Sequence, residues 1–169
     1  MSQPYGCAIT AHLLAADKAG RLLILRTATN HGRWQLPGGR AHAGESPRTA
    51  AAREAREEIG LDLPAGELLV SAWTPGSQGR RDRFALLFST RQLTSADLGA
   101  ITLQANEVDA WSMVESAEVR NLVHPLMAER LAALPAFGRG RYIEHGPAEG
   151  TRRSLLVAEH DDAPPPGDG

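Results

Sequence analysis

The chain has 169 residues, of which 42% are hydrophobic and 22% charged, and these values predict one globular domain with room for a tail. A net charge of −2 argues against general binding to nucleic acid or to a membrane surface. No stretch has membrane-spanning length, and the single cysteine, Cys7, excludes an internal disulfide, so we expect a cytoplasmic protein.

The N-terminal residues predict a β-hairpin followed by a loop. Residues 5–16 are predicted to form the first strand, in which Cys7 would be a small buried residue. Residues 17–20 are predicted to form a turn, and 21–27 its hairpin partner, which is apolar enough to be a central strand. After a polar loop at 28–33, a short extended piece leads into a glycine-rich loop.

A helix is predicted between Ser46 and Gly60, because both are good capping residues. At about 3.6 residues per turn, small apolar side chains share one face of this helix and carboxylates share another. The apolar face contains Ala51, Ala52, Ala55 and Ile59, and the acidic face contains Glu54, Glu57 and Glu58. Such a face is either solvated and neutralised by neighbouring arginines or occupied by a cation. The adjoining glycine-rich loop favours a hard divalent cation.

The rest of the chain predicts more strands and a broken helix. Further strands are predicted at 68–74, 84–90 and 108–114. Residues 94–105 have no clear period, and we expect irregular structure there. Residues 116–134 have helical periodicity, which Pro125 should kink or split.

The pattern changes after residue 137. We therefore predict a domain at 1–137, an extension at 138–160 that forms a β-hairpin, and a disordered tail at 161–169. The apolar strands of the hairpin need cover. Either they fold back along the domain's own sheet edge or they cross to a second subunit in a homodimer, and the homodimer is slightly favoured.

The glycine-rich loop and the helix together carry a recognisable motif. The pattern Gly39-x5-Glu45-x7-Arg53-Glu54-Ala55-x-Glu57-Glu58-x-Gly60-Leu61 resembles the Nudix box, G-x5-E-x7-R-E-U-x-E-E-x-G-U. Every fixed position matches, although the family usually has a larger aliphatic residue than Ala55. The aromatic-x-Leu-Pro-Gly-Gly segment before the box is also similar to the family. The resemblance implies an α/β/α sandwich with a mixed β-sheet and Mg²⁺- or Mn²⁺-dependent hydrolysis of a diphosphate linkage in a nucleoside diphosphate derivative.

The resemblance also implies roles for residues of the box. Glu57 and Glu58 would be the main metal ligands, and Glu54 would share a metal or orient a water. The carbonyl oxygen of Gly38 would be a further ligand. Arg53 would hold the glutamates in place through charge-assisted hydrogen bonds. Glu45 would support the loop or the outer metal shell.

Residues outside the box supply further candidates. The general base would be a box glutamate or a carboxylate from a later loop, where Glu107 is the best candidate; a solvated charge is an equal alternative for it. Arginines that could meet the distal phosphates are Arg26, Arg81 and Arg83. Trp34 could stack on a base. The histidines without metal-ligand spacing, which we expect on the surface or in loops, are His31, His42, His124, His145 and His160.

Three functions compete. A hydrolase acting on a small nucleotide-type substrate is favoured. A non-catalytic nucleotide-sensing Nudix module would need an added DNA-binding segment, and the sequence shows none. An isomerase of isoprenoid diphosphates on the same fold would need a catalytic cysteine, and Cys7 is poorly placed for that. Nucleoside triphosphates, nucleotide sugars and dinucleoside polyphosphates all remain open as substrates.

Overall fold

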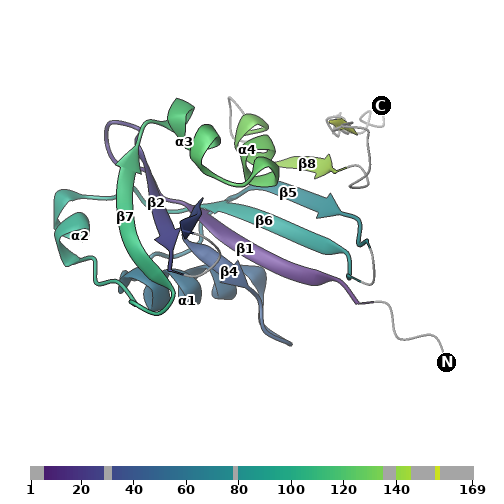
Figure 1. The fold of residues 1–169 in the computed structure, drawn as a ribbon, viewed down its shortest axis with the longest axis horizontal. Coiled ribbons are helices and arrows are strands. Elements are labelled where there is room, and N and C mark those ends of the chain that lie inside the picture. Colours follow the sequence, from purple (N-terminus) through teal and green to yellow (C-terminus); the bar gives the residue numbers. More distant parts are fainter. Residues whose placement is uncertain (1–5, 29–31, 78–79, 135–139, 146–154, 157–169) are drawn as a thin grey trace, which may run out of the picture.

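The structure is a computed structural model that describes residues 6–28, 32–77, 80–134, 140–145 and 155–156 (Figure 1). A six-stranded mixed sheet runs in the order β4-β1-β6-β5-β8-β9 in this part of the chain. Its strands are β1 (Ala8–Leu14), β4 (Gly38–Arg40), β5 (Leu68–Thr74), β6 (Arg83–Ser89), β8 (Arg141–Glu144) and β9 (Leu155–Leu156). β1 runs parallel to β6, and β5 runs parallel to β8.

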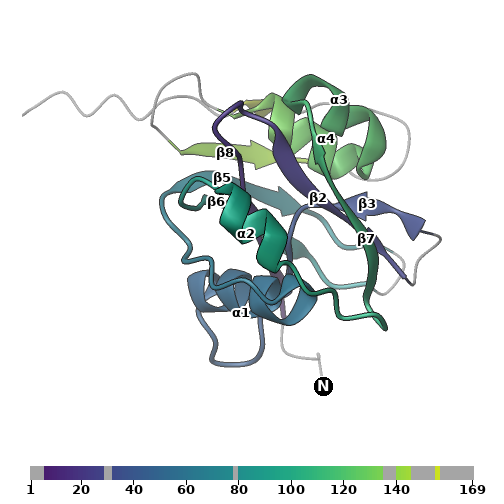
Figure 2. The same cartoon turned by 90° about the vertical axis from the view of Figure 1, so that its left-hand side faces the viewer.

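A second, antiparallel sheet has the order β3-β2-β7. Its strands are β2 (Leu22–Thr27), β3 (Trp34–Gln35) and β7 (Val108–Val114). The helices are α1 (Pro47–Ile59), α2 (Ser95–Ala100), α3 (Ser116–Leu122) and α4 (Pro125–Ala132). Figure 2 shows α1 on one side of the sheets and α3 and α4 on the other. The expected α/β/α sandwich is therefore confirmed.

The predicted hairpin of the first two strands is only partly correct. The turn forms, with the Asp17 N–H bonded to the Arg21 carbonyl at 3.0 Å. Beyond an isolated bridge between Ala16 and Leu22, however, β2 leaves β1 and becomes the central strand of the second sheet. Its neighbouring side chains need cover on both faces: Leu23 packs in the α1-side core, and Leu22 packs in the core under α3 and α4. A position between the two layers provides that cover.

Helix α1 has the caps that its sequence predicts. The Ser46 hydroxyl accepts a hydrogen bond from the Thr49 N–H, and Gly60 ends the helix with a φ of 72°. Ala51 and Ala55 are fully buried, and such small side chains let α1 lie close to β1 and β4. This close approach positions the acidic face of the helix beside the glycine-rich loop.

Of the two helical regions that follow β6, the sequence predicts only the second. Residues 94–105, expected to be irregular, contain α2, which Thr94 and Asp97 start with a capping box. No residue of α2 is buried, so the helix leaves no apolar period in the sequence. The split of 116–134 at Pro125 is confirmed, with the His124 ring accepting a hydrogen bond from the Leu126 N–H.

The C-terminal extension continues the chain's own sheet. β8 pairs in parallel with β5, and β9 pairs with β8 in antiparallel fashion. Ile143 of β8 is 2% exposed and packs in the core with Val70 and Ala72. The described part of the extension thus takes the intramolecular alternative. The predicted tail at 161–169 lies outside the described residues, and no described helix is long and apolar enough to cross a membrane.

Candidate functional site

Two glycines bring the main chain of β4 against β1 and the acidic face of α1. Gly38 has a φ of 134°, and a Cβ added there would lie 2.3 Å from the carbonyl oxygen of Ala11. A Cβ added to Gly39 would lie 2.6 Å from Cδ of Glu54. Glycine is the residue that permits both the left-handed φ and these close approaches. The loop therefore presents its backbone directly to the carboxylates.

Glu58 is buried, with 4% of its surface exposed. Its oxygens accept hydrogen bonds from Nε2 of Gln35, at 3.0 Å, and from the Gly38 N–H, at 2.9 Å. Burial raises the pKa of Glu58 to about 8, and the charge of Glu54 acts in the same direction, whereas both hydrogen bonds oppose the rise. A carboxyl group in this state favours a proton or a cation as its partner.

Glu54 and Glu57 share this helix face but differ in exposure. Burial raises the pKa of Glu54, and the charges of Glu57 and Glu107 add to that rise, while Arg53 opposes it. The side chain of Glu57 is 48% exposed, compared with 15% for Glu54. Exposure of the carboxyl groups therefore increases along this face, from Glu58, which is buried, to Glu57, which reaches solvent.

The Arg53 guanidinium ties the loop to the helix. Nε and Nη2 donate to the two carboxylate oxygens of Glu45, at 2.8 and 3.0 Å. Nη1 donates to Glu54 at 3.0 Å and to Glu57 at 2.9 Å. Nη2 also donates to the carbonyl oxygen of Arg40 at 3.0 Å. These bonds raise the pKa of Arg53 and lower that of Glu45 to about 2. One side chain therefore holds three carboxylates in place.

The donor chemistry of this face fits a hard divalent cation. Three carboxyl groups lie beside a glycine main chain, and the raised pKa of Glu54 and Glu58 indicates that protein groups stabilise their charged forms poorly. In the described conformation these groups bond to protein partners. No three His, Cys, Asp or Glu side chains among the described residues converge closely enough to hold a metal ion.

Glu107 lies just before β7, and its side chain faces solvent. Its charge contributes to raising the pKa of both Glu54 and Glu58. The fold therefore brings the loop candidate for the general base into the electrostatic range of the box carboxylates. Asp109, two residues on, instead forms an ion pair with Arg26, with Nε and Oδ1 2.6 Å apart.

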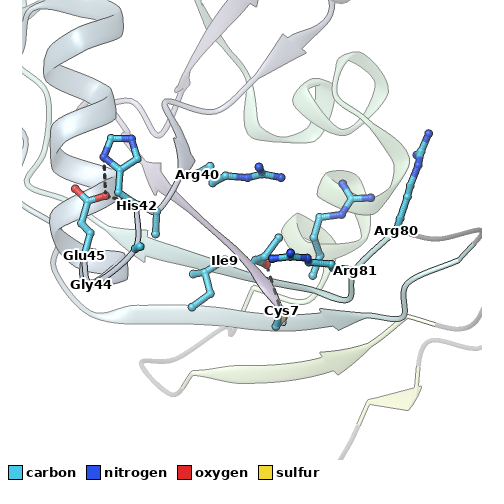
Figure 3. Close-up of a pocket in the computed structure, with 12 residues that line it drawn as sticks. Cys7, Ile9, Arg40, His42, Gly44, Glu45, Arg80 and Arg81 are labelled. Atoms are coloured by element: carbon cyan, nitrogen blue, oxygen red, sulfur yellow. Dashed lines mark hydrogen bonds and ion pairs between the residues drawn. The ribbon is translucent and has the colours of Figure 1, made fainter. Parts of the chain in front are cut away.

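A cavity of about 890 Å³ opens beside the glycine-rich loop, at the ends of β1, β4 and β6. The arginines that line it are Arg40, Arg80, Arg81 and Arg83. Figure 3 shows the first three of them with His42 and Glu45 of the loop. Within the described residues, no carboxylate forms an ion pair with any of the four. The predicted Arg81 and Arg83 thus lie together, with two arginines that the prediction missed.

Cys7 also lines this cavity, and its predicted burial is wrong. The residue is exposed and lies before the first residue of β1, Ala8. Ala8 pairs with Arg83 at the end of the sheet, so Cys7 lies beyond the layers that cover the strand. His145, expected on the surface or in a loop, lies in a loop but is not on the surface, because it is 4% exposed and its Nδ1 lies 2.8 Å from Oε2 of Glu129. It follows β8 directly, and the pairing of β8 with β5 carries it into the fold.

A smaller pocket of about 240 Å³ lies between β1, β3, β6 and α4. Its lining includes Trp34 and Arg83, which the sequence predicted, and Arg130, which it did not. Gln35 lines the pocket as well and donates to Glu58, so the pocket adjoins the carboxylates. Arg26 lines neither cavity among the described residues, and its guanidinium lies 5.9 Å from the centre of the Trp34 ring.

Comparison with known proteins identifies the family. The model of the NUDIX domain matches residues 8–137. The chain belongs to the Nudix hydrolase family. An RNA pyrophosphohydrolase of Rhodospirillum rubrum is 33% identical to this Nudix protein over 129 residues, which are 67% of this chain and 75% of the relative.

Solved structures agree on the Nudix fold. A MutT protein of Methanosarcina mazei Go1 superposes with a TM-score of 0.65 at 21% identity, over 78% of this chain and 94% of that one. An Ap4A hydrolase of C. elegans superposes with a TM-score of 0.59 at 20% identity, over 75% and 93%. At these identities, the likeness concerns the fold alone.

The missed residues differ in the signal they leave in the sequence. Arg40 lies at a variable position of the Nudix box, where its type predicts nothing by itself. Arg130 leaves a signal, because it falls on the buried face of α4 beside Met127 and Leu131. A charged residue on an apolar helix face is unusual, since burying an unpaired charge is costly.

Proposed function

We propose that this Nudix protein is a divalent-metal-dependent pyrophosphohydrolase that cleaves a diphosphate linkage in a nucleoside diphosphate derivative. The observation that carries the proposal is the buried carboxyl group of Glu58, held beside Glu54 and the backbone of Gly38. The similarity to an RNA pyrophosphohydrolase supports the reaction class. The substrate classes considered are nucleoside triphosphates, nucleotide sugars and dinucleoside polyphosphates.

In this proposal Mg²⁺ or Mn²⁺ is held by Glu54, Glu57, Glu58 and the carbonyl oxygen of Gly38. When bound, such a cation neutralises phosphate oxygens and lowers the pKa of a coordinated water. Arg53 orients the carboxylates through its hydrogen bonds to Glu54 and Glu57. Because Glu45 fixes the other edge of that guanidinium, the loop and the helix keep one geometry during turnover.

The substrate would lie across both cavities. Arg81 and Arg83 in the larger cavity bind phosphate oxygens, with Arg40 and Arg80 adding positive charge. Trp34 in the smaller pocket stacks on the base. Arg26 acts indirectly in this arrangement, because it pairs with Asp109 and lies close to the Trp34 ring.

A nucleotide-sensing module without catalysis is the alternative. It would bind nucleotide in the same cavities but would not need three glutamates on one helix face. Like charges at that spacing destabilise a helix, so a face that contains all three favours turnover.

The proposal also covers domain boundaries, location and assembly. Residues 1–137 would form the hydrolase domain, 138–160 a β-hairpin extension and 161–169 a tail, within a cytoplasmic protein. Because Ile143 is buried against the chain's own sheet, the hairpin no longer supports the favoured homodimer. We therefore propose a monomer, which light scattering on the full chain tests.

Substitution of the two main ligands tests the reaction. Glu57→Gln and Glu58→Gln should each lower kcat by at least about a hundredfold, the scale expected when a key charge-stabilising group is lost. The measurement is hydrolysis of a nucleotide library with added Mg²⁺ or Mn²⁺, followed through the formation of the two phosphorylated products. Glu118→Gln, at an exposed position of α3, should keep wild-type activity. Near-normal kcat in both variants would contradict the assignment of Glu57 and Glu58 as metal ligands.

Glu107→Gln tests the general base. If Glu107 removes the proton from the attacking water, the variant should lose kcat while metal affinity stays nearly unchanged. The acidic limb of its pH–rate profile should also move. Full activity with an unchanged profile would return the role to a box glutamate.

A further inference from the structure

Arg130 is a buried cation that forms no ion pair within the described residues. It lies in the last turn of α4, is 9% exposed, and its Nε is buried without a hydrogen bond. No described carboxylate forms an ion pair with it, and the neighbouring Glu129 pairs with His145. Burial, with the nearby charge of Arg83, lowers the pKa of Arg130 to about 10 although the charge of Glu129 opposes the shift, so Arg130 remains charged at neutral pH. Such an arrangement is costly unless an anion occupies the site.

The pocket around Arg130 is basic. Of the described residues that line it, none is acidic, and the ionisable ones are His12, Arg33, Arg83, His124 and Arg130. Burial and the charge of Arg130 lower the pKa of His12 to about 4. Burial and the charges of Arg33, Arg130 and Arg83 also lower the pKa of His124. Burial is the main cause of both shifts, and the arginine charges add to it. Three arginines and no described carboxylate in one small pocket make it a site of positive potential.

Two simpler explanations leave part of the charge arrangement around Arg130 unexplained. The C-terminal end of a helix favours a cation, which explains an arginine in the last turn of α4 but not the buried, unbonded Nε. A pocket for a neutral base would need Trp34 and polar partners, but it would not need three arginines. The accumulated positive charge calls for an anionic ligand.

We propose that this pocket is a second anion subsite, in which Arg130, with Arg33, binds a phosphate group outside the cleaved diphosphate. The assignment of that phosphate to the substrate rests on the proposed function, whereas anion binding itself does not. The preferred substrate class is then a nucleotide that carries an additional phosphate ester on its nucleoside side. Trp34 would stack on the base between the two anionic parts.

Histidine signals can locate the anion without catalysis or metal. His12 and His124 line the smaller pocket, and His42 lines the larger cavity. Inorganic phosphate is titrated into the wild-type chain near pH 7 at constant ionic strength, while imidazole ¹⁵N signals are recorded. The signals of His12 and His124 should shift with saturation, because an anion at Arg130 changes the charge beside both rings, which line the same pocket. A shift confined to His42, or none at His12 and His124, would overturn the subsite.

Thermal unfolding provides an independent test with a matched control. Phosphate should raise the Tm of the wild-type chain more than an equal ionic strength of chloride does. Arg130→Met should lose most of this rise and be at least as stable as wild type without phosphate, because the unpaired charge is gone. Arg120→Met, at an exposed position of α3, should keep the full rise. An undiminished rise in Arg130→Met would contradict the proposal.

The substrate class is tested last, by activity. Wild type should hydrolyse a 3′-phosphorylated nucleoside 5′-triphosphate with a kcat/KM at least about tenfold above that of the unphosphorylated compound, and Arg130→Met should remove that preference. Equal kcat/KM values in wild type would overturn the substrate class. Absence of all hydrolysis would instead sink the proposed function and leave the two binding measurements standing. Histidine shifts produced by guanosine but not by phosphate would identify a base-reading pocket and reject the anion.

Discussion

The pair of Glu45 and Arg53 makes the stability of the loop depend on pH. Hydrogen bonds from Arg53, and from the His42 N–H, lower the pKa of Glu45 from 4.5 to about 2 in the folded chain. A lowered pKa means that the contribution to stability is fully present above about pH 4.5 and is lost as the pH falls toward 2. The contact thus supports the loop throughout the neutral range.

Glu45→Gln should accordingly lower the free energy of unfolding at pH 7 in the absence of metal, since it removes the charged partner of Arg53. The difference from wild type should shrink as the pH falls from about 4.5 toward 2, where Glu45 becomes protonated in both states. Urea unfolding over this pH range measures it. Glu115→Gln, at the start of α3, serves as the control, because the Glu115 side chain makes no capping hydrogen bond. A pH-independent difference would show that the ion pair is not responsible.

Single residues were predictable where the motif places them side by side along the chain. The contacts of Arg53 with Glu54 and Glu57 involve neighbours on one helix, so their spacing in the sequence determines them. The burial of Glu58 depends on Gln35, which a different strand supplies. The exposure of Cys7 depends on where the sheet ends. The spacing of residues along the chain predicts neither which strand packs beside a residue nor where a sheet ends.

The approach of β4 to α1 leaves no room for a side chain at Gly39. A Cβ there would lie 2.6 Å from Cδ of Glu54, near the end of a long side chain that can change rotamer. Gly39→Ala should therefore keep the fold while displacing the Glu54 carboxylate, and kcat should fall at least about tenfold. Gly99→Ala is the matched control in α2, because no atom lies within 4 Å of its added Cβ. Circular dichroism confirms folding, and unchanged kcat in Gly39→Ala would contradict the packing argument.

Elements were predictable where an apolar period or a turn signal accompanies them. The bounds of β5 and β7 agree with the prediction, and Pro125 separates α3 from α4 as expected. Helix α2 was missed because its only signal is the local bonding of Thr94 and Asp97. The sheet to which β2 belongs was also missed, because hairpin signals describe neighbours along the chain and not the layers above and below.

Strands β8 and β9 form one side of the large sheet, and removing both should expose the edge of β5. A chain that ends at residue 138 should be less stable than the full chain and should self-associate, since an unpaired strand edge invites pairing. Ile143→Ala alone should cost ~2–5 kcal/mol, because the side chain is 2% exposed. Denaturant unfolding and light scattering measure both effects. A chain ending at residue 160 should behave as the full chain does, and equal stability of all three chains would refute the role of β8.

The acidic face and the smaller pocket differ in how many segments of the chain form them. The loop and the three glutamates come from one uninterrupted segment, 38–58, whereas the smaller pocket combines Thr10 of β1, Arg83 of β6 and Arg130 of α4. Evolution can therefore inherit the hydrolytic segment intact while it exchanges the pocket one residue at a time. A laboratory selection for new substrates should accordingly concentrate its library on β1, β6 and α4, where each accepted change alters preference without rebuilding the chemistry.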